Sequence, residues 1–397
     1  MPTGYRAEQM ADGLQSIPHV IASADELDNW LRDRRRLTAL AARNRMRLFA
    51  LAMSCSAVLG CADRDAVALR RIEIVPGARI GDRDGPGLVG SRFTNVACSQ
   101  GAYYYSDLLR HDIAVFDSAG TFLRTIGRAG GGPGEFRQPV PLLVDADTLY
   151  AFDRPNGRYT VISARDSIVR IVPFTNVGAE NPYAIALLAD RRVVVNGLRR
   201  DTDSDSLLPL HIVGPDGMIE HSFGDRAFTP ADIRRPSQPF LRALARANDG
   251  GLWAAHRFQY RIDKWTARGE LERTITVQAK WFPAEPVRPP GDGLDFGPSS
   301  GVAILSIVET QDGLWVAMRV PQPDAPPGPL ATGSPWIEDP YRDTMIQLLD
   351  PRTGEIRASV RVDARIDSFA CSDVLVSYAE DADGYPYVQT WRVRLAS

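Results

Sequence analysis

Short apolar or aromatic runs recur along this chain, and each follows a tight turn of small or acidic residues. One copy reads Ser99-Gln100-Gly101 followed by Ala102-Tyr103-Tyr104-Tyr105, and another reads Asn248-Asp249-Gly250-Gly251 followed by Leu252-Trp253-Ala254-Ala255. Six copies occur, at residues 99–105, 146–152, 189–195, 248–255, 311–317 and 372–378. They lie roughly 45 to 60 residues apart, which is the length of one four-stranded propeller blade.

These repeats predict an all-β chain that folds as a six-bladed β-propeller over residues 62–397. The clearest unit has a strand at 112–117, a tight turn at Ser118-Ala119-Gly120 and a returning strand at 121–127. The last unit ends one strand short, after the run at 388–395. We expect residues 69–75 to supply the missing outer strand, so that the two ends of the chain pair and close the ring.

A glycine-rich segment follows the first complete hairpin and runs from Arg128 to Pro139, with Gly130, Gly131, Gly132 and Gly134 before Phe136. It resembles the link between blades in NHL-like and TolB-like six-bladed propellers, where a glycine-rich crossing ends in Phe and Pro. Only this copy of the link matches well. The segment does not have the spacing of a phosphate-binding loop, because no Lys-Ser or Lys-Thr follows it.

The N-terminal part of the chain predicts export. Basic residues at 43–47 precede about 13 apolar or small residues that end at Gly60, which is typical of a signal peptide and short for a membrane span. The ending Val58-Leu59-Gly60-Cys61 resembles the lipobox of bacterial lipoproteins, which implies a signal peptide at 46–61, lipidation of Cys61 and attachment to the cell envelope. Ala62 resembles the residue found in lipoproteins of the outer membrane. The alternative is a buried helix of an ordinary domain.

Residues 1–45 are unusual in front of such a signal, because signal peptides begin near the start of a protein. Met46 lies where the initiator would be expected. We therefore interpret residues 1–45 as an upstream extension that is not necessarily translated.

Composition and the positions of the cysteines further limit the possible partners and covalent links of the chain. The 397 residues carry a formal net charge of -3, and no long basic run follows residue 50, so nothing indicates nucleic acid as a partner. Of the four cysteines, Cys98 and Cys371 occupy equivalent positions in the inner strands of the first and last blades. They are either a disulfide across the closure or two buried free thiols.

Long insertions identify a candidate binding surface. Antiparallel strand order places the links between blades and the loops between second and third strands at one end of the ring, here called the long-loop face. The long segments of this kind lie at 127–139, 200–207, 224–240, 281–300 and 320–342. The binding candidates on them are the charged residues Arg137, Arg234 and Arg235 and the aromatic residues Trp281, Phe282, Phe296 and Trp336, which we expect to be exposed. The alternative is that the aromatic residues only cap the blades.

Evidence for catalysis or a metal is weak in the sequence. Asp201, Asp203 and Asp205 begin like a calcium loop, but Ser206 and Ile212 stand where Gly and Glu are needed. Six-bladed lactonases, which this chain resembles in predicted fold, hold a divalent cation in the central channel. That resemblance would implicate Asn95, Asn181 and Asp367, an incomplete set. The five histidines are scattered, and each is interpreted as structural.

The sequence thus favours a lipid-anchored envelope propeller, monomeric and without a cofactor, that binds a small ligand or a protein on its long-loop face. One alternative is a lactonase-like hydrolase that depends on Ca²⁺ or another divalent cation. Another is a scaffold subunit of an envelope complex. The fold alone does not favour one of these functions over the others, because β-propellers perform many different functions.

Overall fold

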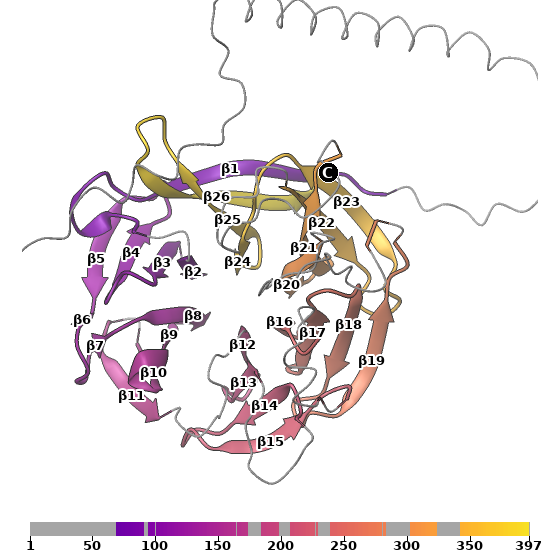
Figure 1. Cartoon of the computed structure of the whole chain (residues 1–397), viewed down its shortest axis with the longest axis horizontal. Helices are drawn as coiled ribbons and strands as arrows, with labels where there is room; N and C mark the ends of the chain where they lie inside the picture. The colour runs from indigo at the N-terminus through magenta and orange to yellow at the C-terminus, as the bar shows by residue number, and fades with distance from the viewer. Residues whose placement is uncertain are drawn as a thin grey trace, which may run out of the picture. The chain divides into compact units, whose positions relative to one another are not determined.

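The computed structural model describes residues 69–90, 94–99, 101–163, 165–173, 184–197, 207–226, 228, 239–279, 281–282, 302–323 and 342–396. These residues belong to one compact unit, Val67–Ser397. Within it, six four-stranded antiparallel sheets stand around a common axis (Figure 1). The predicted six-bladed propeller is therefore confirmed. No helix among the described residues has the length and apolar character needed to span a bilayer.

Each blade runs from an innermost to an outermost strand in chain order. Blade 1 is β2 (Thr94–Ser99), β3 (Ala102–Asp107), β4 (Ile113–Asp117) and β5 (Phe122–Ile126); blade 2 is β8 (Pro139–Asp145), β9 (Thr148–Asp153), β10 (Arg158–Ile162) and β11 (Ile168–Pro173); blade 3 is β12 (Ala184–Leu187), β13 (Val193–Asn196), β14 (Leu210–Val213) and β15 (Ile219–Phe223).

The second half of the ring repeats this order, except that the last blade borrows its outer strand. Blade 4 is β16 (Arg242–Arg246), β17 (Leu252–His256), β18 (Arg261–Trp265) and β19 (Leu271–Thr276); blade 5 is β20 (Ala303–Thr310), β21 (Gly313–Pro321), β22 (Arg342–Leu349) and β23 (Ile356–Val362); blade 6 is β24 (Ser368–Cys371), β25 (Val374–Glu380), β26 (Pro386–Leu395) and β1 (Ile72–Ile80). Short elements also occur, namely β6 (Arg128–Ala129), β7 (Glu135–Phe136), and the 3-10 turns η1 (Gly85–Gly87) and η2 (Arg154–Asn156).

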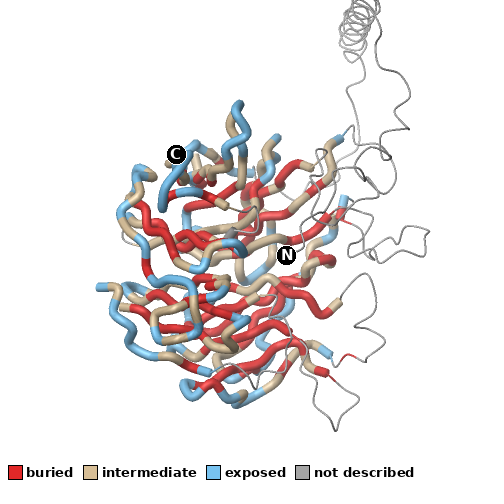
Figure 2. Tube along the Cα trace, turned by 60° about the vertical axis from the view of Figure 1, so that its left-hand side comes forward, coloured by how far each residue is buried: buried red, intermediate tan, exposed pale blue. Residues whose placement is uncertain are grey.

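The core lies between adjacent blades, which explains why the middle strands are apolar at nearly every position. Successive side chains of a strand point to opposite faces of its sheet. In β9, Leu149 and Ala151 pack with blade 1, whereas Tyr150 and Phe152 pack with blade 3. Both faces of the strand are therefore buried, while the exposed positions gather at turns and outer edges (Figure 2).

The ring closes through the two ends of the chain. β1 pairs antiparallel with β26 from Ile72 opposite Leu395 to Ile80 opposite Val388, and the two strands run side by side in Figure 1. The register shifts between Pro76 and Arg79. The predicted closing strand is confirmed, although it begins and ends a few residues later than residues 69–75. Pairing with β1 gives β26 a second partner besides β25 and completes the four strands of blade 6.

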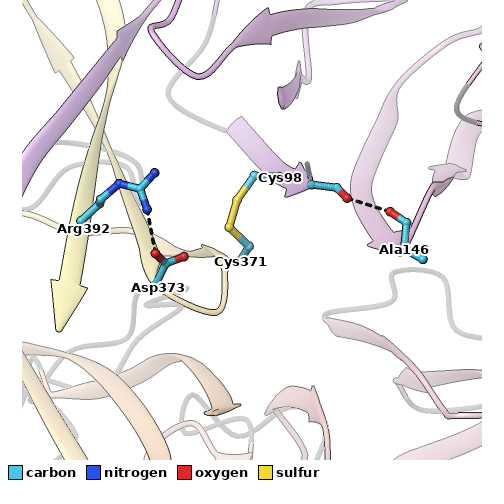
Figure 3. Close-up of a disulfide and its surroundings, with 6 residues drawn as sticks. Cys98, Ala146, Cys371, Asp373 and Arg392 are labelled. Atoms are coloured by element: carbon cyan, nitrogen blue, oxygen red, sulfur yellow. Dashed lines mark hydrogen bonds and ion pairs between the residues drawn. A yellow bond between two sulfur atoms is a disulfide. The ribbon is translucent and has the colours of Figure 1, made fainter. Parts of the chain in front are cut away.

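A disulfide joins the two blades that meet at the closure. Cys98 of β2 and Cys371 of β24 are bonded, with their Cα atoms 5.6 Å apart, and the bond spans the gap between the two innermost strands (Figure 3). Beside it, the Ser99 hydroxyl donates to the Ala146 carbonyl in the first turn of blade 2, at 2.7 Å. Of the two alternatives left by the sequence, the structure contains the bridge.

The turns between first and second strands and those between third and fourth strands share the other end of the ring, here called the short-turn face. Contacts between neighbouring turns hold this face together. Ala189 N–H donates to Gly250 O between blades 3 and 4, and Arg357 donates to Asp312 O within blade 5. The links between blades leave from the opposite, long-loop face.

Candidate functional site

A surface depression lies on the long-loop face between blades 1 and 2. Its volume is about 410 Å³, and it is lined by His111, Ala129, Gly130, Phe136, Arg137, Gln138 and Pro155. These residues come from the loop between β3 and β4, from the glycine-rich link and from η2. The depression therefore forms where one blade passes to the next, and the predicted long segment 127–139 supplies most of it.

The glycine-rich link is fixed by hydrogen bonds. Arg158 donates to the carbonyl oxygens of Gly131, Gly132 and Glu135 at 2.7 to 2.9 Å. The Glu135 carboxylate accepts from Gly132 N–H at 2.8 Å and from the Arg128 guanidinium. These bonds lower the pKa of Glu135, the Gly132 N–H having the largest effect. A link held at so many points presents a preformed surface rather than an adaptable loop.

Glycine is required where the link turns. Gly127 has φ +80°, a conformation that L side chains rarely adopt, and a Cβ there would lie 2.4 Å from the Phe136 ring. Phe136 is only 1% exposed and packs in the core between blades 1 and 2. The close approach of Gly127 to the Phe136 side chain thus keeps the floor of the depression packed against blades 1 and 2.

Arg137 and His111 border the depression. Arg137 N–H donates to the buried Asp153 carboxylate at 3.0 Å, and the Arg137 carbonyl is bonded to His111 Nδ1. The Arg137 side chain is exposed and makes no ion pair with any other described residue. Its guanidinium is thus available to a carboxylate or phosphate beside an apolar surface.

Exposed leucines continue the apolar surface toward blade 1. Leu108 and Leu109 are 37% and 66% exposed in the loop between β3 and β4. The Gln138 side chain donates to the Leu108 carbonyl at 3.3 Å and so connects this loop to the lining of the depression. No pattern in the sequence indicated these leucines, His111 or Pro155 as site residues, because their proximity depends on how blades 1 and 2 pack.

The other predicted binding residues do not join Arg137. Trp281 and Phe282 lie together on the link after blade 4, where Trp281 is 39% exposed. Phe282 was expected to be exposed, which is wrong: it is 7% exposed, and its ring centroid lies 5.3 Å from that of Tyr260. The link crosses over Tyr260, so burial of the ring stabilises the interface between blades 4 and 5. Arg234, Arg235, Phe296 and Trp336 lie outside the described residues.

A second cluster of polar residues is buried between blades 3 and 4. Asp225, His256 and Asp263 place one carboxylate or imidazole atom each within 4.8 Å of the others, the spacing of a metal site. Two arginines enter the same cluster. Arg242 donates to Asp225 at 2.8 Å, and Arg261 donates to Asp263 at 3.0 Å.

Charge balance assigns this cluster a structural role. Two carboxylates face two guanidinium groups, so the set is neutral when His256 is neutral. Burial lowers the pKa of His256, although its hydrogen bond to Asp263 opposes this effect. Burial would raise the pKa of Asp263, but hydrogen bonds from His256 and Thr274 bring it below its ordinary value. A cation placed here would meet two guanidinium groups, so the residues do not fit a metal.

Asn95 and Asp367, the two candidate ligands for a cation in the central channel that the structure describes, already make hydrogen bonds within the fold. Asn95 Oδ1 accepts from Leu142 N–H at 2.8 Å, which joins the inner strands of blades 1 and 2. The Asp367 carboxylate accepts from Tyr378 N–H at 2.9 Å and from Arg365 at 3.0 Å. Asn181, the calcium-like run Asp201–Asp205 and Cys61 lie outside the described residues.

Comparison with known proteins supports the fold. A family model described as a six-bladed β-propeller matches residues 89–159. A Bacteroides fragilis protein described as a candidate exported protein is 13% identical, with a TM-score of 0.54 over 85% of this chain and 98% of that one. A Bacteroides vulgatus protein of the DUF4221 family is 10% identical, with a TM-score of 0.50 over 83% and 100%.

Another structural relative covers a similar share of the chain at a lower TM-score. A gluconolactonase of Xanthomonas campestris is 13% identical over 87% of this chain and 99% of its own, with a TM-score of 0.44. No curated protein matches the sequence. At these identities the likenesses establish the propeller fold alone.

Proposed function

We propose that this chain is an envelope-anchored propeller that binds a ligand or partner protein at the depression between blades 1 and 2, and that it carries out no reaction. The depression itself supports this proposal, because it combines a preformed apolar floor with an exposed arginine. Binding sites in proteins are typically concave and mostly apolar, with a few polar groups that orient the ligand.

The bordering groups define the chemistry of the ligand. Pro155 and Ala129 offer exposed apolar surface, and the exposed leucines at 108 and 109 extend it. Arg137 would hold a negatively charged group at the edge. We therefore infer that the ligand carries an apolar group beside a carboxylate, as does the C-terminal residue of a peptide or a small aromatic acid.

Binding can be tested with N-acetyl-phenylalanine and its methyl ester as probes. The acid is expected to raise the melting temperature of the chain from residue 62 in a concentration-dependent way, and the ester to have a much smaller effect. Arg137→Ala should abolish the difference between acid and ester. Arg268→Ala, which removes an exposed arginine from a turn of blade 4, is the control. Equal shifts for acid and ester would contradict the assigned role of Arg137.

We further propose that Cys61 is acylated and attaches the ring to the bacterial envelope, in the outer membrane. The proposal is supported by the apolar segment and the lipobox-like ending at Cys61. Labelling with an alkyne fatty acid should mark the parent protein but not Cys61→Ser. The Cys61→Ser variant should also leave the carbonate-washed membrane fraction, and its retention there would disprove the anchor.

Metal content separates the binding proposal from the hydrolase alternative. The chain from residue 62 should hold no stoichiometric divalent cation, and its melting temperature should not change with Ca²⁺. One bound cation per chain together with a Ca²⁺-dependent rise in melting temperature would instead favour the lactonase-like hydrolase.

A further inference from the structure

An arginine on the long-loop face lies between the inner ends of blades 4 and 5. Arg257 directly follows β17, the second strand of blade 4. Its N–H donates to Leu241 O at 3.1 Å, just before the innermost strand of its own blade. Its carbonyl accepts from Ile304 N–H at 2.8 Å, in the innermost strand of blade 5. The backbone of Arg257 is therefore fixed beside the strands nearest the central axis (Figure 1).

The surroundings of this side chain are apolar. The Arg257 Cζ lies 5.9 Å from the centroid of the Phe258 ring. Leu241 and Ile304, which bond to the Arg257 backbone, are buried. Phe258 belongs to a buried apolar cluster at this end of blades 3 to 5, here called the Phe258 cluster, which consists of Leu207, Phe228, Phe240, Leu241, Phe258 and Ala303. The guanidinium thus borders apolar side chains.

No carboxylate of the described chain pairs with Arg257. Its guanidinium makes neither a hydrogen bond nor an ion pair with a described residue, and burial lowers its pKa with no charged group opposing the effect. The neighbouring arginines differ in this respect. Arg242 pairs with Asp225 at 2.8 Å, and Arg261 pairs with Asp263 at 3.0 Å. Arg257 therefore keeps a positive charge that these carboxylates do not neutralise.

A charge in this position is unfavourable for the protein alone. Charges removed from water are normally paired, because the ion loses hydration that the apolar surroundings do not replace. Arg257 is partly exposed, so its hydration is reduced but a solute can still reach it from the long-loop face. An anion that binds here would supply the missing counter-charge without first breaking an internal ion pair.

The charge of the site indicates the class of anion. One guanidinium neutralises one negative charge, and a carboxylate carries one charge and accepts two parallel hydrogen bonds from a guanidinium. A phosphate dianion would leave a negative charge beside the Phe258 cluster. We propose that Arg257 binds the carboxylate of a small ligand that enters from the long-loop face. This site is separate from the depression, which is lined by residues of blades 1 and 2.

The test measures the melting temperature of the chain from residue 62, which contains the whole compact unit. Arg137→Ala is introduced first, so that a carboxylate bound at the depression does not contribute. Acetate is compared at constant ionic strength with acetamide, its neutral analogue, and with inorganic phosphate. We expect acetate to raise the melting temperature with concentration, phosphate to act less and acetamide not at all. Arg257→Gln should remove the response to acetate.

Arg226→Gln is the matched control. Arg226 lies over Phe228 of the same cluster, with its Cζ 4.5 Å from the ring centroid. It likewise makes no ion pair with a described residue, but it is exposed. A solvated guanidinium binds a carboxylate weakly, so the response to acetate should persist in Arg226→Gln. Persistence of the response in Arg257→Gln, or equal responses to acetate and acetamide, would overturn the proposal.

A measurement on the chain with Arg257 in place does not depend on how the Arg257→Gln variant folds. Phenylglyoxal modifies arginine side chains, and mass spectrometry identifies each modified residue. At an acetate concentration twice its dissociation constant, modification of Arg257 should slow about threefold, whereas that of Arg226 should not change. An Arg257 modification rate that does not depend on acetate would also overturn the proposal.

Discussion

The disulfide between Cys98 and Cys371 yields a quantitative prediction about stability. Replacement of both residues by serine removes a covalent link between the first and last blades but leaves the β1–β26 pairing in place. In the folded ring the two positions stay close because neighbouring strands hold them. In the unfolded chain their separation is no longer limited. We therefore expect the substitution to act mainly by increasing the entropy of the unfolded state.

The magnitude follows from the length of the closed loop. The bonded cysteines are 273 residues apart in the sequence, for which loop-closure entropy gives about 5 to 6 kcal/mol at 25 °C. Native disulfides deliver less than this limit, and their removal costs about 2–5 kcal/mol. The free energy of unfolding of the double variant should fall within that range.

The assay compares guanidinium unfolding of the chain from residue 62 with that of the double serine variant, with and without reductant. These two cysteines are the only ones after residue 61, so the oxidised protein should contain no titratable thiol and the reduced protein two. Reductant should lower the unfolding midpoint of the parent to that of the variant and leave the variant unchanged. An unfolding free energy within about 1 kcal/mol of the oxidised parent would refute the reasoning.

Two further predictions concern the charged cluster and the glycine-rich link. The pKa of His256 in the folded protein lies below its ordinary value of 6.5, so the folded state binds fewer protons than the unfolded state and stability should decline as pH falls below about 6.5. His256→Asn should flatten this decline, measured as the melting temperature between pH 7 and 5. An unchanged slope would contradict the prediction. Gly127→Ala should lose about 1–3 kcal/mol in a denaturant titration, because its positive φ and the Phe136 ring both oppose a Cβ. Gly131→Ala, whose Cβ would approach nothing closer than 3.6 Å, should change stability by less than about 0.5 kcal/mol, and equal losses in the two variants would argue against the close contact.

The blades could be predicted from the sequence because their signals are local. A turn such as Ser118-Ala119-Gly120 and the apolar strands on either side of it lie within a few residues of one another. The missing outer strand could also be inferred, since a blade that ends one strand short leaves an exposed edge. The boundaries of β1 were less predictable, because its pairing with β26 includes an irregularity between Pro76 and Arg79.

The candidate site could be predicted only in part. The glycine-rich segment and Arg137 were recognisable from the sequence, but the approach of His111 and Pro155 was not. Phe282 illustrates the same limit, since its burial depends on a link that crosses over Tyr260 in another part of blade 4. The buried cluster joins Asp225 from a link to His256 and Asp263 from two strands, and no spacing rule connects these positions.

The sequence by itself determined the six blades and their strand order, because apolar runs, turn chemistry and repeat length act between residues that are near neighbours in the chain. It also determined the closure of the ring, because the last blade ends one strand short. The tertiary structure decided which side chains meet between blades, namely the lining of the depression and the neutral cluster around His256. Those contacts depend on the packing angle of adjacent sheets and on the path of each link, which are set by the whole ring rather than by any one segment.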